Sequence, residues 1–392
     1  MKCLFLVCET LQDFEGVSKK ILEQANALER LGFNVVLSDL KTDDRNKFTG
    51  RYIGREIIDK YSNIDLISKI QSRINYRNLY RYIVANEIKL VYIRYVHFAN
   101  PFFISFLKKL KRSNIKVLLE IPTYPYDQEY NNLKLNNKIV MWIEKRSRRR
   151  FKNLITRILT VTPGTFIFGV PAIEINNGIE VNSINIAEKR ETDNEIHLIG
   201  VASIAFWHGY DRVIEGLHNY YQQHSNNKKV FFHIVGDNNN IESSQHKELV
   251  KRYNLSDYVI FYGRKSGKEL DKIFNRADIA VGSLGCHRIS IKDIKSLKNR
   301  EYCARGIPFF YSETDIDFEN KDFVFKVPGN DNPINIEEII RFLMNNKFDP
   351  IKIRKYAKEN LTWDKQFKKV LDDVFPDFKV PDSPYLGHEI GH

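Results

Sequence analysis

The sequence predicts an α/β protein built from two doubly wound, parallel-sheet domains that face each other across a cleft. The chain has 392 residues, a length that suits two domains better than one. Short apolar runs typical of buried parallel strands alternate with helical segments in two successive series. The polar segment 182–194 separates the two series and indicates a linker. We therefore expect domains at residues 1–181 and 195–361, a terminal helix at 362–375 and a tail at 376–392.

The first series begins with a strand at residues 2–8 (KCLFLVC) and an amphipathic helix at 17–31. Gly16 precedes this helix, where a residue without a side chain allows a ligand to approach the backbone. Further strands are expected at 34–40, 90–96 and 115–121, with a helix at 101–111 and a charged segment with helical patches before residue 90. The loop PTYPYDQEY, which starts at Pro122, combines tyrosines, prolines and acids. It is suited to lining a sugar or acceptor site, and a plain surface turn is the alternative.

A basic segment follows the apolar run IVMWI at residues 139–143. Its sequence KRSRRRFK contains the cations Lys145, Arg146, Arg148, Arg149, Arg150 and Lys152. A helix of this kind can contact anionic lipid head groups, and a solvated helix end is the alternative. A strand near 157–163 and a turn at Asn177-Gly178 close the series.

The second series places strands at 196–202, 230–236, 258–263 and 277–282. Helices are expected at 211–224, 242–253, 268–275 and 297–305, and the last of these is closed by Gly306. Pro308 then opens another strand. In open α/β sheets, ligands bind outside the carboxyl ends of the strands. The loop after residue 282 is therefore the first place to look for a site.

This loop and the helix behind it carry cations together with two carboxylates: His287, Arg288, Lys292, Asp293, Lys295, Lys298 and Glu301. Cations beside a helix N-terminus suit a phosphate, and a carboxylate suits sugar hydroxyls. The combination points to a nucleotide-sugar. Charged residues of this kind also occur in ordinary solvated loops, which is the alternative interpretation.

Composition narrows the choice of partner and compartment. The net charge of +12 favours an anionic partner, whether nucleic acid, membrane surface or phosphorylated substrate. The four cysteines form no CxxC pair, which argues for reduced thiols and against zinc. No apolar run approaches the roughly 20 residues of a membrane span and no signal peptide is evident, so we expect a cytoplasmic protein. The terminal HEIGH matches HExxH but lacks a third ligand, and we interpret it as a frayed terminus.

Two segments of the second series resemble the retaining GT-B glycosyltransferases of family 4, especially those of bacterial capsule and exopolysaccharide synthesis. LKNREYCARGIPFFYS is similar to the family's carboxylate-bearing helix, with Glu301 at the second acidic position and Asp293, eight residues earlier, at the first. GVASIAFWHGYDRVIEGL is similar to its phosphate-binding segment. There the usual Arg falls on Val201 or Ala202, and the usual Lys falls on His208. Arg212, Lys298 and Arg288 are the candidates to supply the missing cation.

The resemblance implies two Rossmann-like domains, with acceptor binding in the first, donor binding in the second, and a terminal helix at 362–375 that returns to the first. It implies transfer of a sugar from a nucleoside diphosphate to an acceptor hydroxyl with retention, without metal or cofactor. Glu301 would hold the ribose, Asp293 the donor sugar, and Arg212, Lys298 and His208 the phosphates. Gly16 and Arg288 are further donor-site candidates, and Tyr124 and Asp127 are acceptor-site candidates by position.

Three rival functions remain. The first is a non-catalytic partner of a true transferase, which the departures at the phosphate segment suggest. The second is a nucleotide-sugar epimerase, which has the same fold. The third is a nucleic-acid binder, which only the net charge suggests. No nucleic-acid-binding motif occurs in the sequence, so we expect no such partner. The acceptor is either soluble or a lipid-linked saccharide, and with the latter the protein would lie on the inner face of the membrane. If His208 binds the diphosphate, its pKa should rise above ~6.5 in the complex, whereas Arg212 or Lys298 should give an affinity that is nearly flat with pH.

Overall fold

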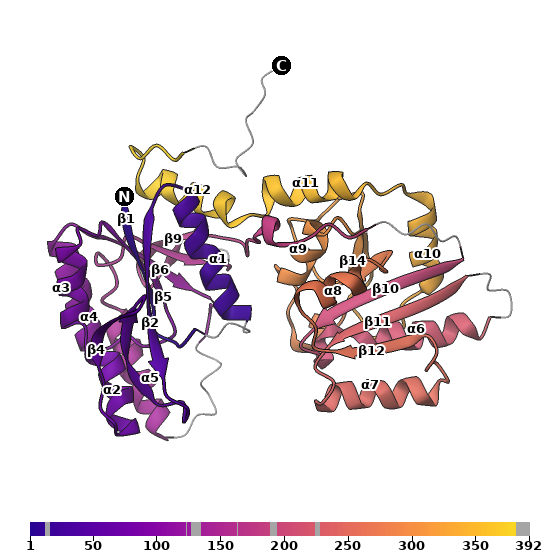
Figure 1. Cartoon of the computed structure of the whole chain (residues 1–392), viewed down its shortest axis with the longest axis horizontal. Coiled ribbons are helices and arrows are strands. Elements are labelled where there is room, and N and C mark those ends of the chain that lie inside the picture. Colours follow the sequence, from indigo (N-terminus) through magenta and orange to yellow (C-terminus); the bar gives the residue numbers. More distant parts are fainter. Residues whose placement is uncertain are drawn as a thin grey trace, which may run out of the picture. The chain divides into compact units, whose positions relative to one another are not determined.

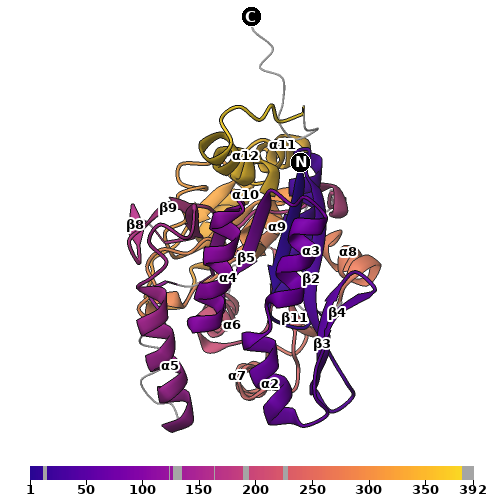
Figure 2. The same cartoon turned by 90° about the vertical axis from the view of Figure 1, so that its left-hand side faces the viewer.

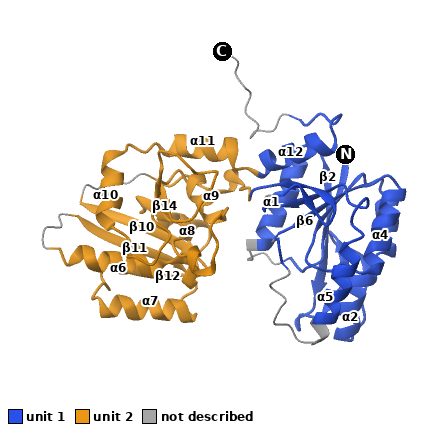
Figure 3. Cartoon of the chain, turned by 180° about the vertical axis from the view of Figure 1, so that it is seen from behind, with its two compact units in different colours: residues 1–176, 363–392 blue, residues 177–362 orange. Residues whose placement is uncertain are grey.

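The computed structural model describes residues 1–11, 16–122, 124–126, 135–162, 164–188, 194–223 and 228–381. The chain forms two compact units, and Figure 3 shows them in different colours. Unit 1 contains residues 1–176 and 363–392, and unit 2 contains residues 177–362. Each unit is built around a largely parallel sheet, so the predicted α/β, doubly wound class is confirmed.

The sheet of unit 1 has the strand order β4-β3-β2-β1-β5-β6-β7-β9-β8. Apolar runs form its central strands because both faces of the sheet are covered. The strands are β1 (Lys2–Val7), β2 (Asn34–Thr42), β3 (Phe48–Ile53), β4 (Glu56–Lys60), β5 (Leu90–Arg94), β6 (Lys116–Ile121), β7 (Arg157–Thr160), β8 (Phe166–Ile167) and β9 (Val170–Glu174).

Helices cover both faces of this sheet (Figures 1 and 2). Helices α2 (Asp65–Ile74), α3 (Arg77–Ala85), α4 (Pro101–Arg112) and α5 (Leu135–Arg148) are drawn on one side of it. The other face packs against α1 (Gly16–Arg30) and α12 (Trp363–Val374) in a core that includes Phe5, Leu28 and Phe367. Asn100 caps α4 by accepting hydrogen bonds from the backbone N–H groups of Phe102 and Phe103 at 2.9 and 3.1 Å.

The antiparallel hairpin of β3 and β4 differs from expectation, because the sequence indicated only a charged segment with helical patches there. Gly54 makes the turn with a φ of +58°, and β3 pairs with β2 at the edge of the sheet. Charged residues are common on edge strands, so this hairpin lacks the apolar run from which a strand is predicted. The helical patches themselves are α2 and α3.

The sheet of unit 2 has the strand order β12-β11-β10-β13-β14-β15, and its paired strands are parallel. Helices again flank it (Figure 1). The strands are β10 (Glu195–Ala202), β11 (Lys229–Gly236), β12 (Val259–Gly263), β13 (Ile279–Val281), β14 (Phe309–Tyr311) and β15 (Val324–Lys326). The helices are α6 (Tyr210–Tyr221), α7 (Ile241–Arg252), α8 (Gly267–Phe274), α9 (Leu297–Ala304), α10 (Ile336–Asn345) and α11 (Pro350–Asn360), with 3₁₀ turns η2 (Val181–Ser183), η3 (Phe206–His208) and η4 (Cys286–Ile289).

Candidate functional site

The strand order of unit 2 places a topological switch point between β10 and β13. From β10 the chain moves outward to β11 and β12, then crosses to β13 on the other side of β10. Open α/β sheets bind ligands outside the carboxyl ends of the strands at such a point. The loops after β10, β13 and β14 meet there. Leu284 N–H donates to the carbonyl of His208 at 3.0 Å, and Ser312 N–H donates to that of Ser283 at 3.0 Å.

Gly209 makes this close approach of the loops possible. It joins η3 to α6 with a φ of +67°, a conformation that residues with a side chain rarely adopt. A Cβ at this position would lie only 2.8 Å from the carbonyl carbon of Leu284. The segment FWHGY therefore needs glycine both for its turn and for its contact with the loop after β13.

His208 lies at the end of η3 and is neutral near pH 7. Its Nδ1 accepts a hydrogen bond from the backbone N–H of Ala205 at 3.1 Å, so the proton of the neutral ring is on Nε2. Burial, and next the charge of Lys298, lower the pKa of His208 to about 3. Without a ligand the ring therefore offers an N–H donor and no positive charge.

Lys298 lies in the first turn of α9 and carries a buried ammonium nitrogen. Its Nζ has no hydrogen-bond partner among the residues that the structure describes, and it lies 5.7 Å from the centre of the Tyr210 ring. Burial lowers the pKa of Lys298 to about 8, although nearby Cys286 and Glu313 oppose the shift. In the ligand-free protein this group therefore loses its proton near pH 8, below the ordinary range of a lysine.

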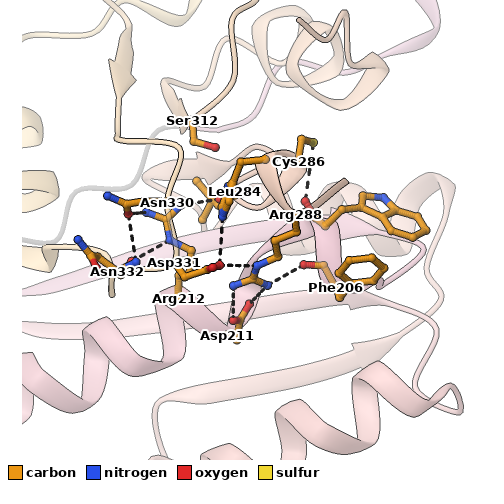
Figure 4. A network of polar contacts seen from close by, with 12 residues as sticks. Phe206, Asp211, Arg212, Leu284, Cys286, Arg288, Ser312, Asn330, Asp331 and Asn332 are labelled. Carbon is orange, nitrogen blue, oxygen red and sulfur yellow. Dashed lines mark hydrogen bonds and ion pairs between the residues drawn. The ribbon is translucent and has the colours of Figure 1, made fainter. Parts of the chain in front are cut away.

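Arg212, expected to bind phosphate, has a structural role instead. The side chain is buried, and the residue is 1% exposed. Its Nε donates to the carbonyl of Asn332 at 2.8 Å, one Nη donates to the carbonyl of Leu284, and the other donates to the carbonyl of Pro328 at 3.0 Å. The guanidinium thus ties α6 to the loop after β15 (Figure 4). Because each of its nitrogens already donates to a carbonyl, Arg212 is a poor candidate to bind phosphate.

Arg288 is also engaged with protein groups (Figure 4). Both of its terminal nitrogens donate to Asp211, at 3.0 and 2.6 Å, and its Nε donates to Asp331 at 2.7 Å. The carbonyl of Phe206 accepts a further hydrogen bond at 2.7 Å. A phosphate at this position would have to compete with two carboxylates, so Arg288 is a weaker donor-site candidate than Lys298.

The paired acids Glu301 and Asp293 differ in their surroundings. Glu301 accepts two hydrogen bonds on Oε1 from Arg305, at 3.0 and 2.9 Å, and its side chain is 26% exposed. Asp293 is exposed on an extended segment whose backbone pairs with Thr314. The structure therefore brings His208 and Lys298 together, while Glu301 pairs with Arg305 and Asp293 lies at the surface.

In unit 1, Gly16 is the first residue of α1, and Tyr124 packs its ring at 5.8 Å from Phe168. Asp127 lies outside the described residues. His97, which the sequence did not single out, follows β5 with a φ of +50° and stacks on Tyr126 at 3.7 Å. A positive φ at a residue other than glycine cannot be recognised from sequence.

The basic segment at the end of α5 divides into exposed and buried cations. Arg148 faces inward, where it bonds to Glu144 at 3.2 Å and lies 4.4 Å from the centre of the Phe168 ring. Its predicted membrane contact is therefore wrong, because the guanidinium is enclosed by protein. The other predicted cations are exposed: Lys145, Arg146, Arg149, Arg150 and Lys152.

Two kinds of feature are missing from the described part of the chain. None of its helices is long and apolar enough to cross a membrane. It also contains no group of three or more His, Cys, Asp or Glu side chains placed to hold a metal ion. The terminal HEIGH lies outside the described residues.

Comparison with known proteins agrees with the fold. Residues 182–360 match the family described as Glycosyl transferases group 1, and no curated protein matches the chain. The structure resembles a glycosyltransferase from Rickettsia africae ESF-5, with 13% identity, a TM-score of 0.66 and coverage of 96% of this chain and 99% of that one. Sucrose-phosphate synthase from Thermosynechococcus elongatus is 13% identical, with a TM-score of 0.63 and coverage of 96% of this chain and 99% of that one. Anabaena Alr3699/HepE in complex with UDP is 12% identical, with a TM-score of 0.62 and coverage of 95% of this chain and 100% of that one. The chain therefore has the two-domain fold of GT-B glycosyltransferases, and its residues 182–360 match the model of the group 1 glycosyl transferase family.

Proposed function

We propose that the protein transfers a sugar from a nucleoside diphosphate sugar to an acceptor hydroxyl, with retention of configuration and without a bound metal ion. The group 1 domain and the GT-B fold support glycosyl transfer. The observation that carries the proposal is the buried ammonium of Lys298, which has no partner among the described residues and lies at the switch point with His208. An unpaired buried cation is costly, and a phosphate would compensate it.

Transfer of the sugar requires that the negative charge of the diphosphate leaving group be stabilised. Fixed positive charge and N–H donors provide this when they are already in place before the bond breaks. Lys298 supplies the charge, and His208 supplies the Nε2–H donor. Anionic oxygens beside Lys298 would also raise its pKa from about 8, so the bound lysine would stay protonated at neutral pH.

The remaining candidates keep the roles that the family resemblance gives them. Glu301 holds the ribose hydroxyls through its carboxylate, Asp293 holds hydroxyls of the donor sugar, and Gly16 is a further residue proposed for donor binding. Tyr124 and Asp127 line the acceptor site. The pathway we propose is assembly of a capsule, exopolysaccharide or lipopolysaccharide.

We further propose that α5 contacts an anionic membrane surface that carries a lipid-linked acceptor. Ile139 is 55% and Trp142 65% exposed, and Arg146 and Arg149 continue the same spacing of three to four residues. An apolar stripe that runs into a basic one is typical of helices that lie in a membrane interface.

The test of the proposed function is nucleotide binding by Lys298→Met, measured by calorimetry against a panel of nucleoside diphosphates and their sugars. We expect the parent to bind one of them and the variant to lose at least about tenfold in affinity, since a charge-assisted hydrogen bond is lost. Lys292→Met is the matched control, because Lys292 is exposed in the loop that precedes α9.

Product analysis completes the test of function. With donor and acceptor, NMR of the product should show the same anomeric configuration as the donor. A parent protein that binds no nucleotide would contradict the proposal. Binding without transfer or hydrolysis would favour the non-catalytic partner, and a changed sugar without acceptor would favour the epimerase.

A further inference from the structure

Glu313 follows β14 and is a second buried charged group at the switch point. The residue is 5% exposed. Its Oε1 accepts hydrogen bonds from the backbone N–H of Cys286 at 2.8 Å and from Ser312 Oγ at 2.6 Å. Its Oε2 is buried and has no hydrogen-bond partner in the described part of the chain. One oxygen therefore holds the turn η4, while the other has no such partner. The carboxylate also lies near the Cys286 thiol, whose pKa is raised to about 11 by burial and next by the charge of Glu313.

The nearby lysines Lys298 and Lys326 feel the charge of Glu313 but do not hydrogen-bond to this oxygen. Lys326 donates to the backbone carbonyl of Glu313 and not to its carboxylate. The charge of Glu313 acts to raise the pKa of Lys298, yet the Nζ of Lys298 also lacks a hydrogen-bond partner among the described residues. Two opposite buried charges that served only stability would be expected to pair directly. Their separation is explained by a ligand that offers negative charge to one and hydrogen-bond donors to the other.

The position of Glu313 indicates which part of the ligand it meets. Thr314, the next residue, pairs with the segment around Asp293: its N–H donates to the carbonyl of Lys292, and its carbonyl accepts from Ile294 N–H, both at 2.9 Å. Glu313 therefore connects the phosphate side, at Lys298, with the segment of Asp293. In a nucleoside diphosphate sugar, the sugar is the part directly beyond the diphosphate.

We infer that Glu313 is a specificity-determining residue, whose Oε2 accepts a hydrogen bond from a hydroxyl of the transferred sugar while Lys298 binds the adjoining phosphate. The inference rests on the proposed function and adds a residue that neither the motifs nor the family resemblance indicated. It also explains why Oε1 is held twice, since two hydrogen bonds fix the direction of the free oxygen.

The decisive variant is Glu313→Gln, which exchanges an acceptor for a donor. Its amide oxygen can still accept from Cys286 and Ser312, while its NH₂ group replaces Oε2. We expect the nucleoside diphosphate to bind within about twofold of the parent. The nucleotide-sugar should lose about tenfold or more in affinity and in kcat/KM, the loss expected for a hydrogen bond to a charged group. Glu319→Gln is the matched control, because it makes the same exchange at an exposed carboxylate that also follows β14.

The same calorimetry separates this inference from the proposed function. UDP, GDP and ADP are compared with their glucose conjugates, and the best-binding pair is used for all variants. A Glu313→Gln protein that loses both ligands equally, or neither, overturns the inference and leaves the proposed function standing. A parent that binds no nucleotide overturns both. If Glu313→Gln does not fold, Glu313→Asp keeps the charge with a shorter reach and should show the same selective loss for the sugar; equal binding by Glu313→Asp would overturn the inference.

Discussion

At the scale of single residues, Lys298 shows that a binding site can be recognised by a buried charged group that destabilises the folded protein. A protein interior seldom leaves an ammonium without a partner, because the charged form is poorly solvated there. The lowered pKa, to about 8, expresses that penalty. Function is a sufficient reason to keep such a residue, since natural proteins retain destabilising groups where ligands bind.

We predict that Lys298→Met raises the stability of the ligand-free protein. The folded pKa of about 8 lies below the ordinary lysine pKa of 10.5, so the penalty is complete below pH 8 and disappears as pH rises to 10.5. The shift corresponds to at most roughly 3 kcal/mol. Urea unfolding at pH 7 and pH 10 measures it, with Lys292→Met as the exposed control. A gain as large at pH 10 as at pH 7 would show that packing, and not charge, is responsible.

The same residues show what the sequence could not reveal. Lys298 and His208 were recognised because they fall on a loop and a helix beside identifiable apolar strands. Glu313 was missed because a single acid after a strand resembles a solvated one until its burial is known. Arg212 was misassigned because its partners are backbone carbonyls of residues 284, 328 and 332, far along the chain, and carbonyl groups leave no trace in sequence.

At the scale of elements, regular strands and helices were predictable and edge structure was not. The apolar run IHLIGVA became β10, and α9 ended one residue before the expected limit, directly ahead of Arg305 and Gly306. The hairpin of β3 and β4 was not predicted because its strands carry charged residues and lie at the edge of the sheet. Loop positions at the site are set by contacts between loops, such as that of Gly209 with Leu284, which single-segment patterns do not contain.

Arg212 is predicted to stabilise the junction between α6 and the loop at residues 328–332. Arg212→Met should lower the free energy of unfolding by on the order of 3 kcal/mol or more, because buried carbonyls lose charged donors. The folded fraction should bind nucleotide like the parent. Chemical denaturation measures the free energy of unfolding, and calorimetry at low temperature measures nucleotide binding. Arg252→Met is the control, because Arg252 lies on the exposed side of α7. Lost affinity in a fully folded variant would restore Arg212 as a ligand.

At the scale of the whole molecule, the chain leaves unit 1 at residue 177 and returns to it at residue 363. The returning helix α12 completes the core of unit 1 through Trp363, Phe367 and Leu371. Arg30 and Asp364 add an ion pair at 2.6 Å between α1 and α12. Unit 1 is therefore built from both ends of the described chain, and its stability depends on the segment that follows unit 2.

Charge is the other property of the whole molecule, and part of the net +12 is concentrated at the end of α5. We predict that replacing Arg146, Arg149 and Arg150 by Gln weakens binding to anionic vesicles roughly hundredfold, since each cation near such a surface contributes about 1 kcal/mol. Co-sedimentation with phosphatidylglycerol and phosphatidylcholine vesicles at two salt concentrations measures this. Replacing Lys108, Lys111 and Arg112 on α4 is the matched control, because these exposed residues carry the same charge elsewhere on unit 1. Equal losses in the two triple variants would mean that total charge, and not this helix, directs the protein to membranes.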